Sequence, residues 1–249
     1  MNVTMRFFPM ALSFCAVLFL MGCAQKQQVK KDPDPWEDFN RKVFYFNSGF
    51  DHYFMKPFAV GYQAVTPPPV ETGVSNFYAN LSDFRTAFNN FIQLKFSDGF
   101  SDTGRFFVNS TVGIVGLVDV ASKMGMKKHN EDFGQTLGRW GVPSGPYVML
   151  PFLGPSTARD GPALIVDYYT APQTYFVDVV ALRNSLWALD FINRRAELIS
   201  LDAVLQDVAY DKYDLLRDAY LTRREYLVTD GRSQQEKEDD LMLELELLE

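Results

Sequence analysis

Candidate catalytic residues are few, and their spacing matches none of the common active sites. The two histidines, His52 and His129, have no second histidine or cysteine at metal-ligand spacing. Ser156 and Thr157 lack the second glycine of a nucleophile elbow, and no strand pattern precedes them. No glycine-rich loop is followed by Lys-Ser or Lys-Thr, so the sequence does not indicate nucleotide binding or hydrolysis.

The acidic residues favour structural roles in the same way. Asp83, Asp102, Asp132 and Asp160 would have to be brought together to form an acid pair. Each lies beside a predicted helix start or a glycine turn, where an aspartate side chain caps backbone N–H groups. We expect these aspartates to be caps and the histidines to be surface or loop residues. The sequence predicts no enzymatic activity, no cofactor and no metal.

The clearest covalent chemistry belongs to Cys23, because an apolar segment leads into Leu20-Met21-Gly22-Cys23. A basic start, an apolar stretch and a small residue are typical of a secretory signal. The Leu-x-Gly-Cys spacing resembles the bacterial lipobox, in which the signal is cut before a cysteine that carries diacylglycerol and an N-acyl chain. We predict a signal over 1–22 and lipidation of Cys23. The alternative is an ordinary thiol behind an uncleaved anchor.

The surroundings of Cys23 indicate a compartment. Ala24 follows it, and lipoproteins without an aspartate there resemble those exported to the outer membrane. The only other cysteine, Cys15, leaves with the signal. No intramolecular disulfide is then available, so packing must stabilise the domain.

Charge is concentrated at the C-terminal end. Residues 230–249 carry eight acids against Arg232 and Lys237, a net of −6, whereas the whole chain carries −7. The remainder is nearly neutral and has no basic stripe, which argues against nucleic acid as a partner. With 15% aromatic residues, this composition suits a protein that works against lipid.

The chain divides into one domain with two flanking segments. Residues 23–33 are polar, lysine-bearing and proline-punctuated, as a tether would be. Residues 34–228 are expected to form a single helical domain. The acidic stretch 229–249 is expected to be mobile, because it has too little apolar surface to dock alone.

Aromatic and aliphatic residues recur at three- and four-residue steps and predict amphipathic helices. The first is expected to be capped by Asp34 and to be closed by Pro57 and then by the prolines at 67–69. The second is expected to run from Val70 to Leu94, and the third to start at Ser101 or Asp102. Later helices are expected over 163–169, 177–191 and 202–227, with no strand. Glycine and proline between 134 and 162 predict a packed or membrane-surface loop.

The run 109–121, NSTVGIVGLVDVA, has no charge until Asp119. It is far shorter than the ~20 residues that a spanning helix needs. Short apolar runs are usually core, but a lipid anchor brings this one to a membrane. We predict a re-entrant, lipid-inserted helical hairpin, followed by Lys123, Lys127 and Lys128 at the headgroup level. The inserted residues are Val112, Gly113, Ile114, Val115, Gly116, Leu117 and Val118.

Several blocks carry a family resemblance. In chain order they read DPWE at 34–37, GVSNF at 73–77, GRF at 104–106, KHNEDFGQTLG at 128–138 and LPFLGPST at 150–157. They resemble the MlaA (VacJ) family of outer-membrane lipoproteins over roughly residues 33–226.

The resemblance implies an all-α, ring-like, monotopic protein in the inner leaflet of the outer membrane, beside a porin trimer. Such a protein takes misplaced phospholipid through an amphipathic channel and passes it to a soluble periplasmic lipid carrier, which maintains lipid asymmetry. The hairpin would then control access to the channel. A structural lipoprotein that scaffolds porins without moving lipid is the alternative, and a periplasmic hydrolase is less favoured because no nucleophile–base pair is visible.

Overall fold

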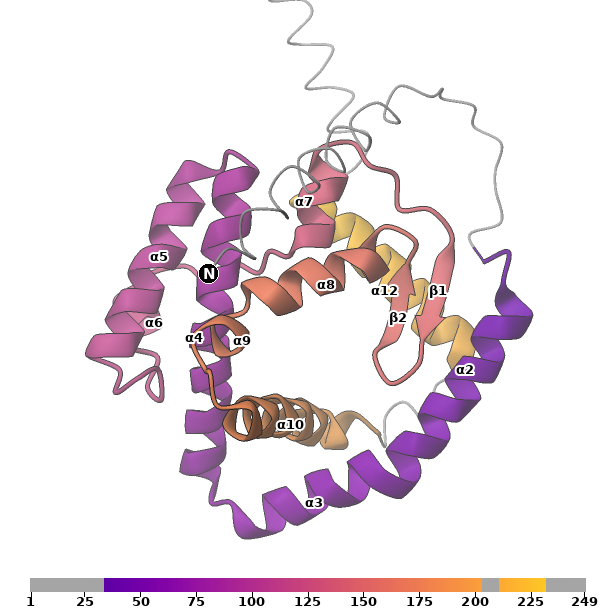
Figure 1. Ribbon diagram of the computed structural model, residues 1–249, viewed down its shortest axis with the longest axis horizontal. Helices are drawn as coiled ribbons and strands as arrows, with labels where there is room; N and C mark the ends of the chain where they lie inside the picture. Colours follow the sequence, from indigo (N-terminus) through magenta and orange to yellow (C-terminus); the bar gives the residue numbers. More distant parts are fainter. Residues whose placement is uncertain (1–33, 203–210, 232–249) are drawn as a thin grey trace, which may run out of the picture.

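The computed structural model describes residues 34–202 and 211–231, which form helices in a ring-like arrangement with one small sheet (Figure 1). The predicted helical class is confirmed. Cys23, the signal, the tether, residues 203–210 and most of the acidic segment lie outside the described residues.

The first arc of the ring is formed by α2 (Glu37–Phe50), a π-helical turn η2 (Asp51–Met55) and α3 (Lys56–Val65) (Figure 1). Of the prolines expected to close this region, Pro57 does not end the helix, whereas the helix does end at Val65, just before Pro67. Pro57 lies in the first turn of α3, where a proline fits because the N–H that it lacks has no partner within that helix. The chain therefore stays helical for another two turns and more.

The predicted cap at Asp34 is also wrong. The helix starts with Trp36 as its N-cap and has no side-chain cap. Asp34 is buried instead, accepting hydrogen bonds from the Asn40 amide at 2.7 Å and from the Tyr213 hydroxyl. A buried carboxylate needs such donors, so Asp34 joins α2 to the C-terminal helix rather than capping its own.

The second arc is the antiparallel pair α4 (Pro68–Ile92) and α5 (Phe96–Thr111), which make the most extensive contact between elements. The second predicted helix is confirmed. The third begins earlier than expected, and Gly99 lies inside α5 rather than at a helix end. A Cβ at Gly99 would come within 2.8 Å of the Phe91 ring, so the glycine serves close helix packing.

After α5 come α6 (Val120–Lys123) and α7 (Phe133–Arg139), followed by β1 (Tyr147–Leu150) and β2 (Gly154–Thr157). The strands pair antiparallel, with Tyr147 opposite Thr157 and Leu150 opposite Gly154. The expectation of no strand and of an irregular loop over 134–162 is therefore wrong. The turn between the strands uses left-handed backbone at Phe152 and Gly154, so the glycine and proline content marks a tight hairpin.

The ring closes through α8 (Asp160–Thr170), α9 (Pro172–Tyr175), α10 (Val180–Glu197) and α12 (Lys212–Val228). The helices expected over 163–169 and 177–191 correspond to α8 and α10 with shifted ends. Asp211 caps α12. Residues 229–231 of the predicted mobile tail are described, and Asp230 pairs with Lys95 and Arg139.

Polarity is inverted relative to a water-soluble protein. The apolar core is a small cluster of Val43, Tyr147, Met149 and Tyr213 between α2, β1 and α12. Among the described residues, more polar than apolar side chains are buried, whereas large apolar side chains are exposed on nearly every helix. An apolar exterior of this extent marks an interaction surface. Within the described chain, no helix has both the length and the hydropathy to cross a bilayer.

Candidate functional site

The apolar run after α5 is exposed, and most of it is not helical. Only one turn, α6, follows it, so the second arm of the expected helical hairpin is much shorter than predicted. Ile114 and Val115 both have positive φ, +54° and +57°. That backbone region is strained for β-branched residues, at roughly 1–3 kcal/mol each. The side chain of Ile114 is 64% exposed, so burial in the domain interior does not offset this strain.

The run is closed on itself by backbone hydrogen bonds. The Gly116 N–H donates to the Asn109 carbonyl at 2.8 Å, and the Val118 N–H donates to the Gly113 carbonyl at 2.9 Å. Gly113 has no room for a side chain, because a Cβ would lie 2.2 Å from the Val118 carbonyl oxygen. The run is thus a hydrogen-bonded turn whose apolar side chains are exposed on the surface of the domain.

A buried network of charged and amide side chains holds the turn formed by residues 112–118 against α4 and α5. Arg105, almost fully buried, donates to Asp83 at 3.3 Å and to Asp119 at 3.2 Å. Asn109 donates to the same Asp119 at 3.1 Å and accepts from the Ala121 N–H at 2.9 Å. Burial alone would raise the pKa of Asp119, but hydrogen bonds from Ser122 and Asn109 and the Arg105 charge lower it. The carboxylate therefore stays ionised and fixes both ends of the turn.

The three lysines after the turn have different environments. Lys128 donates to the buried Asp83 carboxylate at 2.7 Å and to the Ala79 carbonyl at 3.1 Å. Lys123 and Lys127 are exposed and form no ion pair within the described part of the chain. Lys128 therefore has a structural partner that its position in the sequence did not suggest.

An apolar groove lies beside the turn, with a volume of about 230 Å³. Helices α4 and α5, Val115 of the turn, and the α9–α10 region form its walls. Its lining is apolar apart from three polar side chains. The lining residues are Phe77, Asn80, Leu81, Phe106, Ser110, Val115, Pro172, Gln173, Phe176, Val177 and Leu186.

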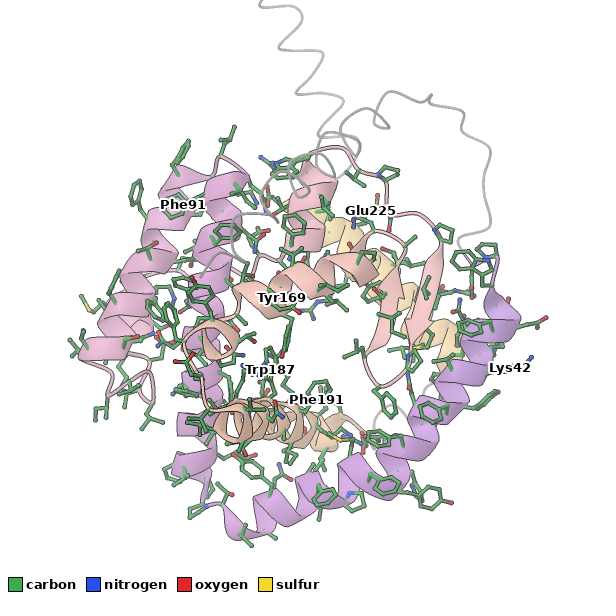
Figure 2. All side chains as sticks on the ribbon, viewed as in Figure 1. Lys42, Phe91, Tyr169, Trp187, Phe191 and Glu225 are labelled. Carbon is green, nitrogen blue, oxygen red and sulfur yellow. The ribbon has the colours of Figure 1, made fainter. Side chains whose placement is uncertain are left out.

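Aromatic side chains also border the centre of the ring. Tyr169 on α8 and Trp187 and Phe191 on α10 are drawn around that centre (Figure 2). Tyr168 and Trp187 stack with their ring centroids 5.3 Å apart, and the Trp187 indole donates to Thr174 at 3.2 Å. These contacts join α8, α9 and α10 along the border.

The candidate catalytic residues have structural partners. His129 Nδ1 lies 3.1 Å from both carboxylate oxygens of the buried Asp102. The capping role is confirmed for Asp132, which accepts from the Gln135 N–H at 2.8 Å. It is wrong for Asp83, Asp102 and Asp160. Asp83 and Asp160 form internal ion pairs, and Asp102 accepts a hydrogen bond from Asn90 and contacts His129. Sequence spacing did not reveal these pairs because their members come from different elements.

A second charged centre joins α7, α8 and α12. Both terminal nitrogens of Arg224 donate hydrogen bonds to the Asp132 carboxylate at 2.6 Å. Its Nε donates a hydrogen bond to Asp160 at 2.8 Å. Burial opposes ionisation of Asp132, but Arg224 lowers its pKa to about 2. Asp167, nearby on α8, has no such partner. Its burial raises its pKa to about 6, against the attraction of Arg85.

The Ser156–Thr157 pair is buried in β2. The Thr157 hydroxyl accepts a hydrogen bond from the Asp160 N–H at 3.1 Å. This contact helps to fix the start of α8, whose N-cap residue is Arg159.

Together these features define a class of protein: a ring of helices with one small sheet, in which the buried side chains of the described residues are mostly polar or charged and most large apolar side chains are exposed. The chain belongs to the MlaA lipoprotein family, whose model matches residues 32–227.

Individual relatives agree with this assignment. The intermembrane phospholipid transport system lipoprotein MlaA of Escherichia coli is 34% identical over 85% of each chain. The protein of that name from Haemophilus influenzae is 30% identical over 93% of this chain and 96% of its own. A solved structure concerned with maintenance of bacterial outer membrane lipid asymmetry superposes with a TM-score of 0.69, at 34% identity, covering 78% of this chain and 98% of that one.

Proposed function

We propose that this chain is a non-enzymatic lipoprotein of the outer membrane that extracts phospholipid from the outer leaflet. In this proposal it hands the phospholipid to a soluble periplasmic carrier and so maintains lipid asymmetry. The observation that carries the proposal is the apolar groove beside an exposed, strained apolar turn. A groove of about 230 Å³ accommodates a segment of acyl chain, and an exposed apolar turn gains free energy by entering lipid. The names of the relatives support phospholipid as the cargo.

The proposed seating is monotopic, in the inner leaflet beside a porin trimer. Lipid on Cys23 anchors the domain, and a diacylglycerol together with an N-acyl chain anchors stably. Residues 112–118 insert into the bilayer and control access to an amphipathic channel through the ring. Lys123 and Lys127 lie at the headgroup level. Lys128, with a side chain 40% exposed, is proposed to lie at the same level, although its ammonium group pairs with Asp83.

A lipid count tests this function against the porin-scaffold alternative. The full-length protein is purified in mild detergent with its co-purifying partners, and phospholipid is extracted and counted. If the protein transfers lipid, the purified wild type should carry bound phospholipid. Leu186→Trp, which places a larger side chain in the groove, should reduce the count severalfold.

Leu182→Trp is the matched control, because Leu182 lies one turn away on α10 and is exposed. It should leave the count unchanged. A wild-type protein that carries porin but no phospholipid would support the scaffold instead.

A further inference from the structure

A small polar recess adjoins the apolar groove. The two cavities share Leu81, Pro172 and Gln173 in their walls. The recess adds Arg85 of α4 and Asp190 and Arg194 of α10 to its lining. Its volume is about 30 Å³, above the roughly 10–15 Å³ that a cavity needs to hold one water-sized group. An oxygen-sized group therefore fits inside.

Two polar groups that line the recess have no hydrogen-bond partner. Gln173 is only 8% exposed, and its buried Oε1 accepts no hydrogen bond. Arg85 Nε is also buried and unpartnered. Within the described chain Arg85 forms no ion pair and no side-chain hydrogen bond. A buried donor without a partner is unfavourable, and more so when it is charged, so a ligand that supplies the missing partner would be favoured here.

The charges around the recess favour an anion. Asp190 is already paired with Arg194 at 2.8 Å, and the Arg194 side chain is 60% exposed at the edge. Arg85 attracts the Asp167 carboxyl of α8 but forms no direct ion pair within the described chain, so its guanidinium group is available to an anion in the recess. Guanidinium groups bind phosphate oxygens with charge-assisted hydrogen bonds, and the Gln173 amide can present either its oxygen or its NH₂.

We propose that this recess holds the phosphate of a phospholipid whose acyl chain occupies the adjoining apolar groove. One phosphate oxygen enters between Arg85 and Gln173, and the rest of the headgroup remains at the mouth beside Arg194. The assignment rests on the proposed lipid-transfer function and adds a headgroup contact to it. The apolar groove alone would accept any long acyl chain, so the recess is what selects phospholipid over a neutral lipid.

The test compares two lipids with the same acyl chains. Native mass spectrometry of the full-length protein in detergent measures binding of dioleoylphosphatidylglycerol and of dioleoylglycerol, which lacks the phosphate. The wild type should prefer the phospholipid by about tenfold or more. Arg85→Gln and Gln173→Leu should each bring that ratio close to one. Arg223→Gln removes the same charge at an exposed position on α12 and should leave it unchanged.

The outcomes separate the two proposals. If the wild type binds neither lipid, the transfer function itself fails. If it binds both lipids equally, or if the folded Arg85→Gln variant keeps the preference, the headgroup site fails while transfer stands.

Two further checks protect the assignment. Inorganic phosphate that binds as tightly as the phospholipid would overturn it in favour of a plain anion site. Melting curves check that Arg85→Gln is folded. If it is not, Gln173→Leu, a change of similar size without a change in charge, decides the question.

Discussion

Ile114 combines an exposed apolar side chain with left-handed backbone, and both properties can be tested in one substitution. Ile114→Asp should leave the protein folded, because the side chain meets solvent or lipid rather than core, and aspartate adopts positive φ more readily than isoleucine. Circular dichroism in detergent should show an unchanged helical spectrum. Binding to phospholipid vesicles and the phospholipid count should fall.

The matched control for this substitution is Ala121→Asp. Ala121 is fully buried at the end of the same turn, so an unpaired carboxylate there should cost several kcal/mol, comparable to the whole stability of a domain. Unfolding of Ile114→Asp as well would show that the turn belongs to the core. A folded Ile114→Asp with normal lipid handling would remove residues 112–118 from the access role.

Asp167 is a second residue with a defined test. Its folded-state pKa is about 6, above the ~3.9 of an unfolded chain. Between these values the folded state holds more protons, so stability falls as pH rises from about 4 to 6. Asp167→Asn keeps an oxygen that can accept from the Phe133 N–H and stays neutral. It should raise the free energy of unfolding by roughly 1–3 kcal/mol at pH 7 and change it little at pH 4.

Denaturant titrations at pH 4 and pH 7 measure this difference in the free energy of unfolding.

Asp132, in the same charged centre, has the opposite pH dependence of stability. Its pKa is lowered to about 2, so its pairing with Arg224 stabilises the fold above about pH 4. That contribution is lost as the pH falls from about 4 towards 2. For Asp167, equal stabilisation by Asp167→Asn at pH 4 and pH 7 would contradict its raised pKa.

At the level of elements, the β-hairpin is held by asparagines of α2. Asn40 is fully buried, donates to the Tyr147 carbonyl at 3.1 Å and accepts from the Met149 N–H at 2.8 Å. Asn47, two turns further on, makes the equivalent pair of contacts with the Leu150 carbonyl and the Phe152 N–H. The helix side chains thus act as the next hydrogen-bonding partner of strand β1.

Asn40→Ala should therefore destabilise the protein by about 2–4 kcal/mol, since it leaves the Tyr147 carbonyl and the Met149 N–H without this partner and removes one of the donors to Asp34. Asn47→Ala should cost less, because that side chain is only partly buried. Thermal unfolding in detergent gives the ranking. Equal, small effects would mean that α2 does not hold the hairpin.

The sequence predicted where most helices lie, but not which side of each faces inward. On α4 the aromatic face and the Asn/Asp face were both evident from spacing. In the structure Asn80, Asp83 and Asn90 are buried, whereas Phe84 and Phe88 are exposed. Periodicity identifies two faces, and the usual assignment of the apolar face to the interior holds only when the surroundings are water.

Other features depended on contacts between distant segments. The pairing of Asp83 with Arg105 and Lys128 joins residues from α4, α5 and a later loop, and local patterns such as caps do not report it. The short hairpin was missed because its prolines suggested irregular structure. By contrast, the exposure of the apolar side chains within residues 112–118 agrees with the membrane placement predicted from the lipid anchor, since the composition of the run alone favoured core. The groove beside them was not predicted, since its lining has the composition of an ordinary core.

At the level of the whole molecule, the lipid anchor is the feature on which the membrane proposal depends. Intact-mass measurement of the membrane-extracted protein should give the mass of residues 23–249 plus a diacylglycerol and an N-acyl chain. The Cys23→Ala variant should lack that addition and be released more readily from membranes, because the exposed apolar side chains would then have to hold it alone. An unmodified wild-type mass would contradict the lipidation.

The polar interior also has a thermal consequence. The heat capacity change of unfolding comes mainly from apolar surface that becomes exposed to water, and polar surface contributes with the opposite sign. Among the residues that the structure describes, amides, carboxylates and guanidinium groups make up much of what is buried, while many large apolar side chains are already exposed. The heat capacity change per residue should therefore lie below the usual ~12–15 cal/mol/K. Its stability curve should be correspondingly flat, so that cooling weakens this fold far less than it weakens a protein with an apolar core.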